Sequence, residues 1–284
     1  MPWFLSQSED TVNINSYTSL YGVLGNPVSH SLSPVMHNSA FAHMGYNAVY
    51  LAFQVTDIAS AITGLKGLGI KGASVTIPHK VAVKAFLDEM DENALKIGAV
   101  NTILNKEGRL FGYNTDCMGA MAALSEKTTI RGKDVVIIGA GGAARAIGFG
   151  IISEGGNLTV LNRSTDKGEQ LAKDLGAEFC PLSEFSRAKC QVLINTTSVG
   201  MTPHVEAMPV QKADLGKEMV VMDIVYNPLK TTLLKAAEDM GCLTVDGVSM
   251  FVCQGAAQFE LWTGKKAPVN VMREVVINTL LKKV

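Results

Sequence analysis

Short apolar runs alternate with longer amphipathic stretches along most of the chain. In the first half, the strand-like runs are YGVLG, AVYLAFQV and GASVTI, and apolar residues recur with helical spacing at about 34–44 and 57–67. A further run with helical spacing, HKVAVKAFLDEM, follows Pro78. Repeated strand–helix–strand units of this length predict a mainly parallel sheet that is covered by helices.

A second series of the same kind follows the polar stretch KTTIRGK. Its strand-like runs are DVVIIG, NLTVLN, AEFCPL, QVLINTT and MVVMDIVY. The C-terminal part is helical, and its runs SMFVCQGAAQFELWTG and VNVMREVVINTLLKK are joined through Pro268. Because no strand separates these two helices, they can return to brace the first domain. Residues 1–17 are interpreted as a loosely structured leader without an assigned role.

The composition indicates a two-domain protein that acts on small molecules. The chain has 284 residues, of which 47% are hydrophobic, and this is enough for two modest cores. Its 25 basic and 26 acidic side chains give a net charge of −1, which argues against nucleic acids and anionic membranes as partners. The sequence has no apolar run of transmembrane length and no signal-peptide pattern, so we expect a cytoplasmic protein. Its 5 cysteines are widely spaced and show no metal-ligand pattern, so we expect reduced thiols and no metal site.

The run DVVIIGAGGAARAIGFGI places a glycine-rich turn directly between an apolar strand and a helix. Glycines at these positions let the turn close and let a pyrophosphate approach the backbone amides at the helix N-terminus. This strand–turn–helix context is typical of dinucleotide-binding sites. The candidate cofactor contacts in the turn are Gly139, Ala140, Gly141, Gly142 and Ala143.

The end of the next strand indicates which dinucleotide is bound. An NAD enzyme carries an acidic residue about twenty residues after the glycine-rich turn, where it binds the ribose hydroxyls. Here the strand NLTVL is followed by Asn162, Arg163 and Ser164, with Lys167 close behind and no acid at the strand end. A guanidinium group can pair with a 2′-phosphate, so NADP is favoured over NAD. The alternative is that Arg163 is only a solvated loop residue.

Polar residues in the first half form a second group of candidates. Ser31 and Ser33 precede a helix that Pro34 would begin, and the alternative role for Ser33 is that of an N-cap. Asp116, in the stretch NTDCMG, could likewise be an N-cap, and Asn101, in AVNT, could be a turn residue. By themselves, these residues fit either a substrate site or ordinary local structure.

Lys80 stands out because of its predicted position. Pro78 suits the first turn of a helix, so Lys80 would lie at the positive end of the dipole of that helix. An ammonium group is electrostatically disfavoured there, which suggests a chemical role. The alternative is an ordinary exposed helix lysine.

Together these segments resemble the shikimate dehydrogenase family from about residue 20 to the C-terminus. The similar stretches include GNPVSHSLSPVMHN, GASVTIPHK, GAVNT, GAGGAARA, NTTSVGM, DIVYNPLKT and GVSMFVCQGAAQFELWTG. The resemblance implies the reversible, NADP-dependent reduction of 3-dehydroshikimate to shikimate in the aromatic amino-acid pathway. It also implies an α/β fold of two domains. Residues 1–116 and 250–284 would form an N-terminal α/β substrate domain completed by the C-terminal helices, and residues 117–249 a Rossmann-type NADP-binding domain.

The resemblance further implies roles for individual residues. Lys80 and Asp116 would be the catalytic pair, and the sequence leaves open which of them transfers the proton. Ser31 and Ser33 would bind the substrate carboxylate with Tyr226 nearby, while the ring hydroxyls would be read by Thr76, Asn101 and Gln254. The nicotinamide end of the cofactor would be lined by Thr197 and Gly247, and Ile224 would be a further cofactor contact. Ser74 stands where asparagine is frequent in the family, so the resemblance gives less support to one substrate hydrogen bond.

Several alternatives stay open from sequence. A quinate dehydrogenase or an enzyme of dual specificity would differ by accepting an additional hydroxyl beside the carboxylate. A folate-linked methylene dehydrogenase has a similar two-domain plan, although NTTSVGM and QGAAQFELWTG argue against it. A non-catalytic NADP-binding regulator would be expected to lack the acid/base pair or the carboxylate site. A homodimer is compatible with the sequence.

Overall fold

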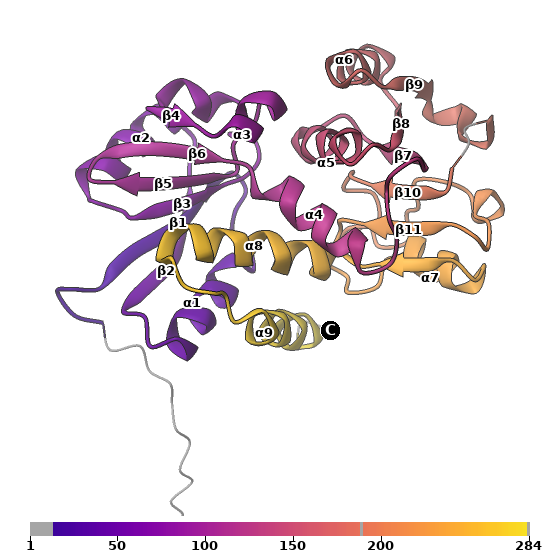
Figure 1. Cartoon of the computed structure of the whole chain (residues 1–284). Helices are drawn as coiled ribbons and strands as arrows, with labels where there is room; N and C mark the ends of the chain where they lie inside the picture. The colour runs from indigo at the N-terminus through magenta and orange to yellow at the C-terminus, as the bar shows by residue number, and fades with distance from the viewer. Residues whose placement is uncertain (1–13, 188–189, 283–284) are drawn as a thin grey trace, which may run out of the picture.

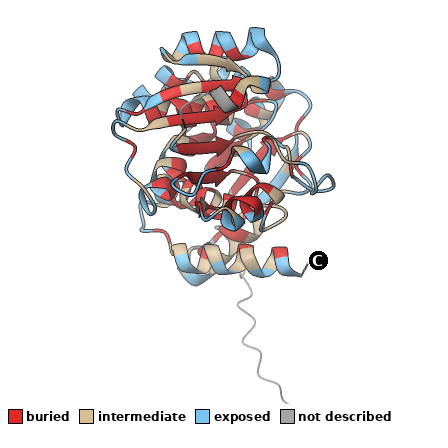
Figure 2. Ribbon diagram, turned by 90° about the vertical axis from the view of Figure 1, so that its right-hand side faces the viewer, coloured by how far each residue is buried: buried red, intermediate tan, exposed pale blue. Residues whose placement is uncertain are grey.

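The computed structural model describes residues 14–187 and 190–282, so most of the proposed leader lies outside the described residues. This part of the chain forms two α/β halves, each built on a six-stranded sheet. Buried residues concentrate on the strands, and exposed residues lie mainly on outer helices and loops (Figure 2). Among the described residues, no helix combines the length and the apolar character needed to cross a membrane.

The first sheet has the strand order β2-β1-β3-β5-β6-β4. Its strands are β1 (Ser19–Gly25), β2 (Ala48–Gln54), β3 (Gly72–Val75), β4 (Glu89–Met90), β5 (Thr102–Lys106) and β6 (Arg109–Tyr113). Its helices are α1 (Ser33–His43), α2 (Ile58–Gly67) and α3 (Glu92–Ile97), with a 3₁₀ segment, η1 (Ala82–Phe86). The predicted parallel pairing holds for β2, β1 and β3. However, β5 and β6 form an antiparallel hairpin that the sequence analysis missed.

The prediction of a helix that begins at Pro78 and carries Lys80 in its first turn is wrong. Residues 77–81 form a turn that leads into η1 and then into β4. The carbonyl group of Lys80 accepts a hydrogen bond from the backbone N–H of Val100 at 2.8 Å, so it is engaged by another segment instead of by a helix of its own. A tertiary hydrogen bond has replaced the local one, and Lys80 does not begin a helix.

The second sheet is entirely parallel, with the order β12-β11-β10-β7-β8-β9. This is the strand order of a dinucleotide-binding Rossmann fold. Its strands are β7 (Asp134–Ile138), β8 (Asn157–Asn162), β9 (Glu178–Pro181), β10 (Val192–Asn195), β11 (Val220–Asp223) and β12 (Leu243–Val245). Its helices are α5 (Gly142–Ser153), α6 (Thr165–Leu175) and α7 (Thr232–Asp239), with 3₁₀ segments η2 (Leu182–Arg187) and η3 (Lys212–Asp214). The chain order reverses between β7 and β10, which is where such sheets bind ligands.

Two long helices run between the halves (Figure 1): α4 (Thr115–Ser125) and α8 (Gly247–Thr263). They cross closely at Gly119, where an added Cβ would lie 2.7 Å from the backbone nitrogen of Gln254. Only glycine allows the two backbones to approach in this way. The predicted domain limits at 116–117 and 249–250 fall within these helices, and those limits stay predictions.

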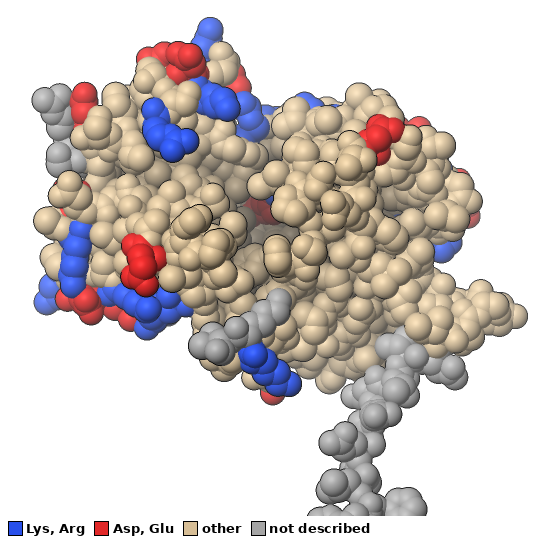
Figure 3. Space-filling view, turned by 180° about the vertical axis from the view of Figure 1, so that it is seen from behind, with Lys and Arg blue, Asp and Glu red and all other residues tan. Residues whose placement is uncertain are grey.

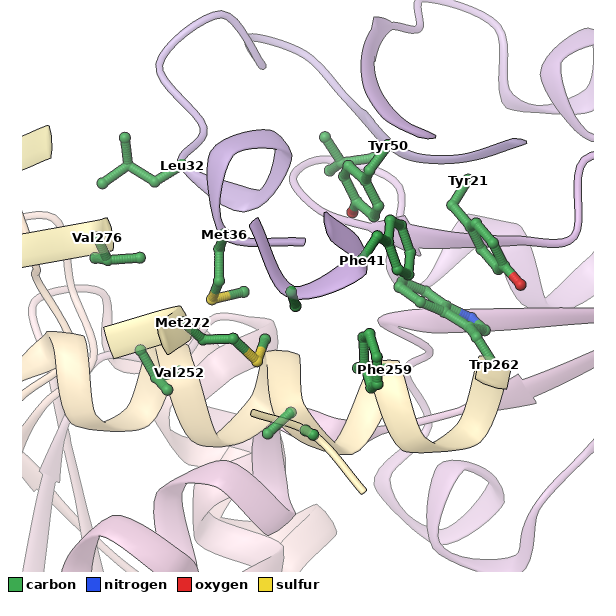
Figure 4. Close-up of a cluster of buried hydrophobic side chains, with 14 of the residues drawn as sticks. Tyr21, Leu32, Met36, Phe41, Tyr50, Val252, Phe259, Trp262, Met272 and Val276 are labelled. Atoms are coloured by element: carbon green, nitrogen blue, oxygen red, sulfur yellow. The ribbon is translucent and has the colours of Figure 1, made fainter. Parts of the chain in front are cut away.

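The C-terminal helices α8 and α9 (Val269–Leu281) pack on the first half, as predicted. Figure 4 shows Phe259 and Trp262 of α8 beside Tyr21 and Phe41 of the first half. The rings of Tyr21 and Trp262 lie 5.3 Å apart, and the Trp262 indole donates to the carbonyl of Ile103 at 2.9 Å. Burial of these large rings is the main force that holds the C-terminal helices in place.

Candidate active site

Lys80 and Asp116 form an ion pair at the boundary between the halves. The distance from Lys80 Nζ to Asp116 Oδ2 is 2.5 Å, and the side chains are 18% and 9% exposed. Asp116 is not the N-cap of α4, because the Asn114 side chain accepts hydrogen bonds from the backbone N–H groups of Asp116 and Cys117. The alternative role for Asp116 is therefore wrong, and its carboxylate is free to face Lys80.

Asn101 orients the carboxylate of Asp116 from the opposite side. Its amide nitrogen donates to Asp116 Oδ1 at 2.8 Å and to the hydroxyl of Thr115 at 3.0 Å. Its amide oxygen accepts from the backbone N–H of Thr115 and from the hydroxyl of Thr102, both at 2.8 Å. Asn101 is only 2% exposed. In this state both ends of its amide are engaged within the protein, so contact with a substrate hydroxyl would require an exchange of partners.

A buried hydrogen-bond chain that the sequence analysis did not identify leads from Asn101 back to α8. Gln258 donates to Thr102 Oγ1 at 3.0 Å and accepts from the hydroxyl of Ser74 at 2.8 Å. Ser74 in turn accepts from the hydroxyl of Tyr50 at 2.6 Å. Ser74 therefore has partners inside the protein. The signal in the sequence that could have indicated this chain is Gln258, a second glutamine four residues after Gln254 in a mainly apolar helix.

The proposed carboxylate-binding serines lie at the start of α1. The N-cap of this helix is Leu32, which has no side-chain cap, and Ser33 is the first helical residue. The N-cap role for Ser33 is therefore wrong. The hydroxyl of Ser31 accepts from the backbone N–H of Ser33 at 3.2 Å, which places the two serines side by side. Burial raises the pKa of the nearby Tyr50, and the Ser33 hydroxyl acts against that rise.

The remaining predicted substrate contacts come from both halves. Thr76 follows β3 and packs over Gly25, where an added Cβ would lie 2.3 Å from the Thr76 methyl carbon. Gln254 lies beside α4 and donates to the carbonyl of Phe251 at 2.9 Å. The ring of Tyr226 lies 4.8 Å from that of Phe251, and burial raises the pKa of Tyr226. Tyr226 is therefore brought to α8, the helix that carries Gln254.

The glycine-rich turn faces the ion pair. Gly139 has a φ of 116°, which favours glycine, and Gly141 is the N-cap of α5. An added Cβ on Gly142 would lie 3.6 Å from Lys80 Cδ, so Lys80 lies against the N-terminus of α5. Lys80 is thus beside the positive end of a helix dipole, but the helix belongs to the other half of the molecule. Ala140 and Ala143 are half-buried in the same turn.

The other predicted cofactor contacts lie at the same edge of the second sheet. Arg163 and Lys167 are exposed after the end of β8, and the Asn162 side chain donates to the carbonyl of Ser164 at 2.8 Å. Thr197 follows β10 and Ile224 follows β11, while Gly247 begins α8. Parallel neighbours place these strand ends together. Figure 3 shows the surface hollowed between the two halves.

Comparisons with known proteins identify the family. A model of the shikimate dehydrogenase substrate-binding domain matches residues 23–103, a shikimate/quinate 5-dehydrogenase model matches 121–249, and a shikimate 5′-dehydrogenase C-terminal model matches 247–277. The NADP(+)-dependent shikimate dehydrogenase of Pyrococcus abyssi is 48% identical over 265 residues, which cover 93% of this chain and 99% of that protein. The chain belongs to the shikimate dehydrogenase family.

Solved structures agree with this family assignment. A shikimate dehydrogenase in complex with NADP+ is 41% identical, with a TM-score of 0.91 over 94% of this chain and 97% of that one. The Thermus thermophilus shikimate 5-dehydrogenase in complex with NADP(H) and shikimate is 35% identical, with a TM-score of 0.85 over 93% and 100%. The resemblance found in the sequence motifs and the α/β fold with a Rossmann-type half are therefore confirmed. The roles of individual shikimate dehydrogenase residues stay predictions for this chain.

Proposed function

We propose that this protein is an NADP-dependent oxidoreductase that reversibly reduces 3-dehydroshikimate to shikimate, in the pathway to chorismate and the aromatic amino acids. The observation that carries this proposal is the Lys80–Asp116 pair, which lies against the glycine-rich turn of the Rossmann half. Family membership supports the same reaction, since NADP(+)-dependent shikimate dehydrogenases align with nearly the full chain.

The residues of the second half fit NADP. The positive φ of Gly139 and the absence of a Cβ atom at Gly139, Gly141 and Gly142 leave room for a pyrophosphate, and Arg163 offers a cation where NAD enzymes have an acid. When bound, NADPH supplies the hydride that adds to the ketone carbon.

Lys80 is the proposed acid of the reduction. Hydride addition leaves negative charge on the former ketone oxygen, and Lys80 Nζ–H donates a proton to that oxygen, which yields the alcohol. Asp116 Oδ2 holds Nζ at 2.5 Å, and Asn101 fixes the other carboxylate oxygen. Because the Lys80 side chain remains 18% exposed, solvent can return the proton after each turnover. In the oxidation of shikimate the same pair accepts the proton.

The central experiment is an initial-rate assay with shikimate and with quinate, each with NADP and with NAD. We expect the highest kcat/KM with shikimate and NADP. Comparable rates with quinate would instead favour an enzyme of dual specificity. Binding of NADP without turnover of either substrate would favour a non-catalytic regulator.

The carboxylate site gives a separate prediction. Ser31→Ala and Ser33→Ala should each raise the KM for shikimate about 10- to 150-fold, because a hydrogen bond to a charged group contributes about 1.5 to 3 kcal/mol. The KM for NADP should not change. Ser125→Ala is the control, because Ser125 lies on the exposed side of α4 and donates only to the carbonyl of Ala122. Unchanged shikimate binding in both variants would contradict the carboxylate role.

We further propose that the protein works in the cytoplasm on these small molecules, with no nucleic-acid or membrane partner. Its net charge of −1 supports this view. Assembly into a homodimer stays a prediction, which light scattering of the purified protein will test.

A further inference from the structure

Asp223, the last residue of β11, is a fully buried carboxylate outside the catalytic pair. Its Oδ1 accepts from Asn195 Nδ2 at 2.9 Å and from the backbone N–H of Val225 at 3.1 Å, and its Oδ2 accepts from the hydroxyl of Thr231 at 2.7 Å. Among the described residues, no ion pair includes Asp223. Burial raises the pKa of Asp223 to about 6, and these hydrogen bonds act against that rise. All three of its partners are neutral donors, so the carboxylate acts only as an acceptor.

The hydrogen bond from Asn195 connects Asp223 to the loop after β10. Asn195 is the last residue of β10, and its Oδ1 accepts from both the backbone N–H of Thr197 at 3.1 Å and the hydroxyl of Thr197 at 2.7 Å. Since Oδ1 is occupied by Thr197, the amide nitrogen faces Asp223. The same loop packs on the glycine-rich turn, because an added Cβ on Gly139 would lie 3.1 Å from the Thr197 methyl carbon.

The hydrogen bond from the Val225 N–H connects Asp223 to the loop after β11. The N–H group that Asp223 binds belongs to Val225, which lies between Ile224 and Tyr226. The carbonyl of Val225 packs against α8, since an added Cβ on Gly247 would lie 2.4 Å from it. A single carboxylate therefore connects three proposed cofactor contacts, Thr197, Ile224 and Gly247, of which Thr197 and Gly247 are proposed to line the nicotinamide end.

We propose that Asp223 is a positioning residue that acts through Asn195 and the Val225 N–H to hold the two loops receiving the nicotinamide end of the cofactor. It touches neither substrate nor cofactor itself. The inference rests on the proposed function, because it assumes that NADP binds at this edge of the sheet. A purely structural carboxylate would support folding without setting cofactor affinity.

The test compares Asp223→Asn with Thr231→Val. Asp223→Asn keeps the size of the side chain but replaces one acceptor oxygen with an NH2 group, which cannot accept from the donors that surround it. We therefore expect the Kd and KM for NADPH to rise about tenfold. The kcat at saturating cofactor should change less than threefold. Thr231→Val removes the third donor and the N-cap of α7, to which Leu234 N–H donates at 3.3 Å, but leaves both loop contacts. It should lower Tm without changing the KM for NADPH.

A double variant provides the rescue. Asp223→Asn combined with Asn195→Asp exchanges donor and acceptor across the two strands, so the contact between them and the acceptor for Thr197 are both restored. The weaker donation from Asn195 Nδ2 to the carbonyl of Val199 at 3.3 Å is lost. The Val225 contact is not restored, and we expect the Kd for NADPH to recover about threefold relative to Asp223→Asn. If Asp223→Asn does not fold, Asn195→Ala tests the Asn195 connection alone and should raise the Kd for NADPH.

The results distinguish the two roles. A lower Tm with unchanged NADPH affinity in Asp223→Asn, or an absence of recovery in the double variant, would overturn the positioning role. The Kd for NADPH is measured by fluorescence without turnover. A wild-type protein that binds NADPH but reduces no 3-dehydroshikimate would therefore overturn the proposed function and leave this inference standing.

Discussion

Replacing Lys80 with methionine is expected to lower kcat by about two to four orders of magnitude, which is the usual contribution of a positioned acid or base. Shikimate affinity should fall much less, because the carboxylate and most hydroxyl contacts are proposed to lie on other residues. The measurement is kcat over a pH series, with shikimate affinity determined by calorimetry on the same preparation. Near-wild-type kcat at neutral pH would show that Lys80 is an ordinary lysine.

The stability of the same variant separates two physical descriptions of Lys80. A lysine that began its own helix would destabilise that helix, and its removal would be neutral or favourable. The structure instead pairs Lys80 with a carboxylate that is 9% exposed, so its removal leaves Asp116 without a cation. We expect a loss of about 1 to 3 kcal/mol, less than for a fully buried pair because Asn101 still binds the other oxygen.

Lys66→Met is the matched control for this experiment. Lys66 pairs with Asp88 at 3.0 Å, but both side chains are 38% exposed. Exposed pairs contribute about 0 to 1 kcal/mol, so this variant should change neither kcat nor Tm appreciably. A similar loss of activity in both variants would point to a general effect of removing a lysine.

Replacing Arg163 with alanine is expected to raise the KM for NADP about 10- to 150-fold while leaving the KM for NAD nearly unchanged. The range corresponds to about 1.5 to 3 kcal/mol for a charge-assisted hydrogen bond to the 2′-phosphate. Initial rates with both cofactors provide the measurement. Lys173→Ala is the control, since Lys173 is an exposed cation in the last turn of α6, the helix that follows Arg163. Equal losses for both cofactors would exclude the 2′-phosphate role.

Local sequence was sufficient for the cofactor half. The strand, the glycine-rich turn and the helix of residues 134–153 are contiguous, and the positive φ at Gly139 is a requirement that glycine satisfies by itself. The alternation of apolar strands and helices likewise predicted the strands from β7 to β11, but α7 and the short strand β12 were missed. The curated relatives at 43–48% identity are named as NADP(+)-dependent shikimate dehydrogenases, which confirms the cofactor predicted from the arginine after β8.

Local sequence was misleading where a distant segment supplied the deciding interaction. Apolar spacing and Pro78 predicted a helix, but the carbonyl of Lys80 accepts a hydrogen bond from the N–H of Val100. The β5–β6 hairpin likewise depends on hydrogen bonds between two strands. Ser33 and Asp116 could both have been N-caps by local rules, yet Leu32 and Asn114 occupy those positions. Propensity sums over neighbours along the chain, whereas these outcomes depend on neighbours in space.

By itself, therefore, the sequence determined the two-part α/β plan, the glycine-rich turn and the types of residue available for chemistry, since each depends on a short contiguous stretch. Only the tertiary structure decided that Lys80 meets Asp116 across 36 residues, and that it does so beside the N-terminus of α5. It alone connected Gln258 to Thr102, 156 residues away, and Asp223 to the loops after β10 and β11. Buried polar groups must find partners wherever packing places them, and packing is a property of the whole chain.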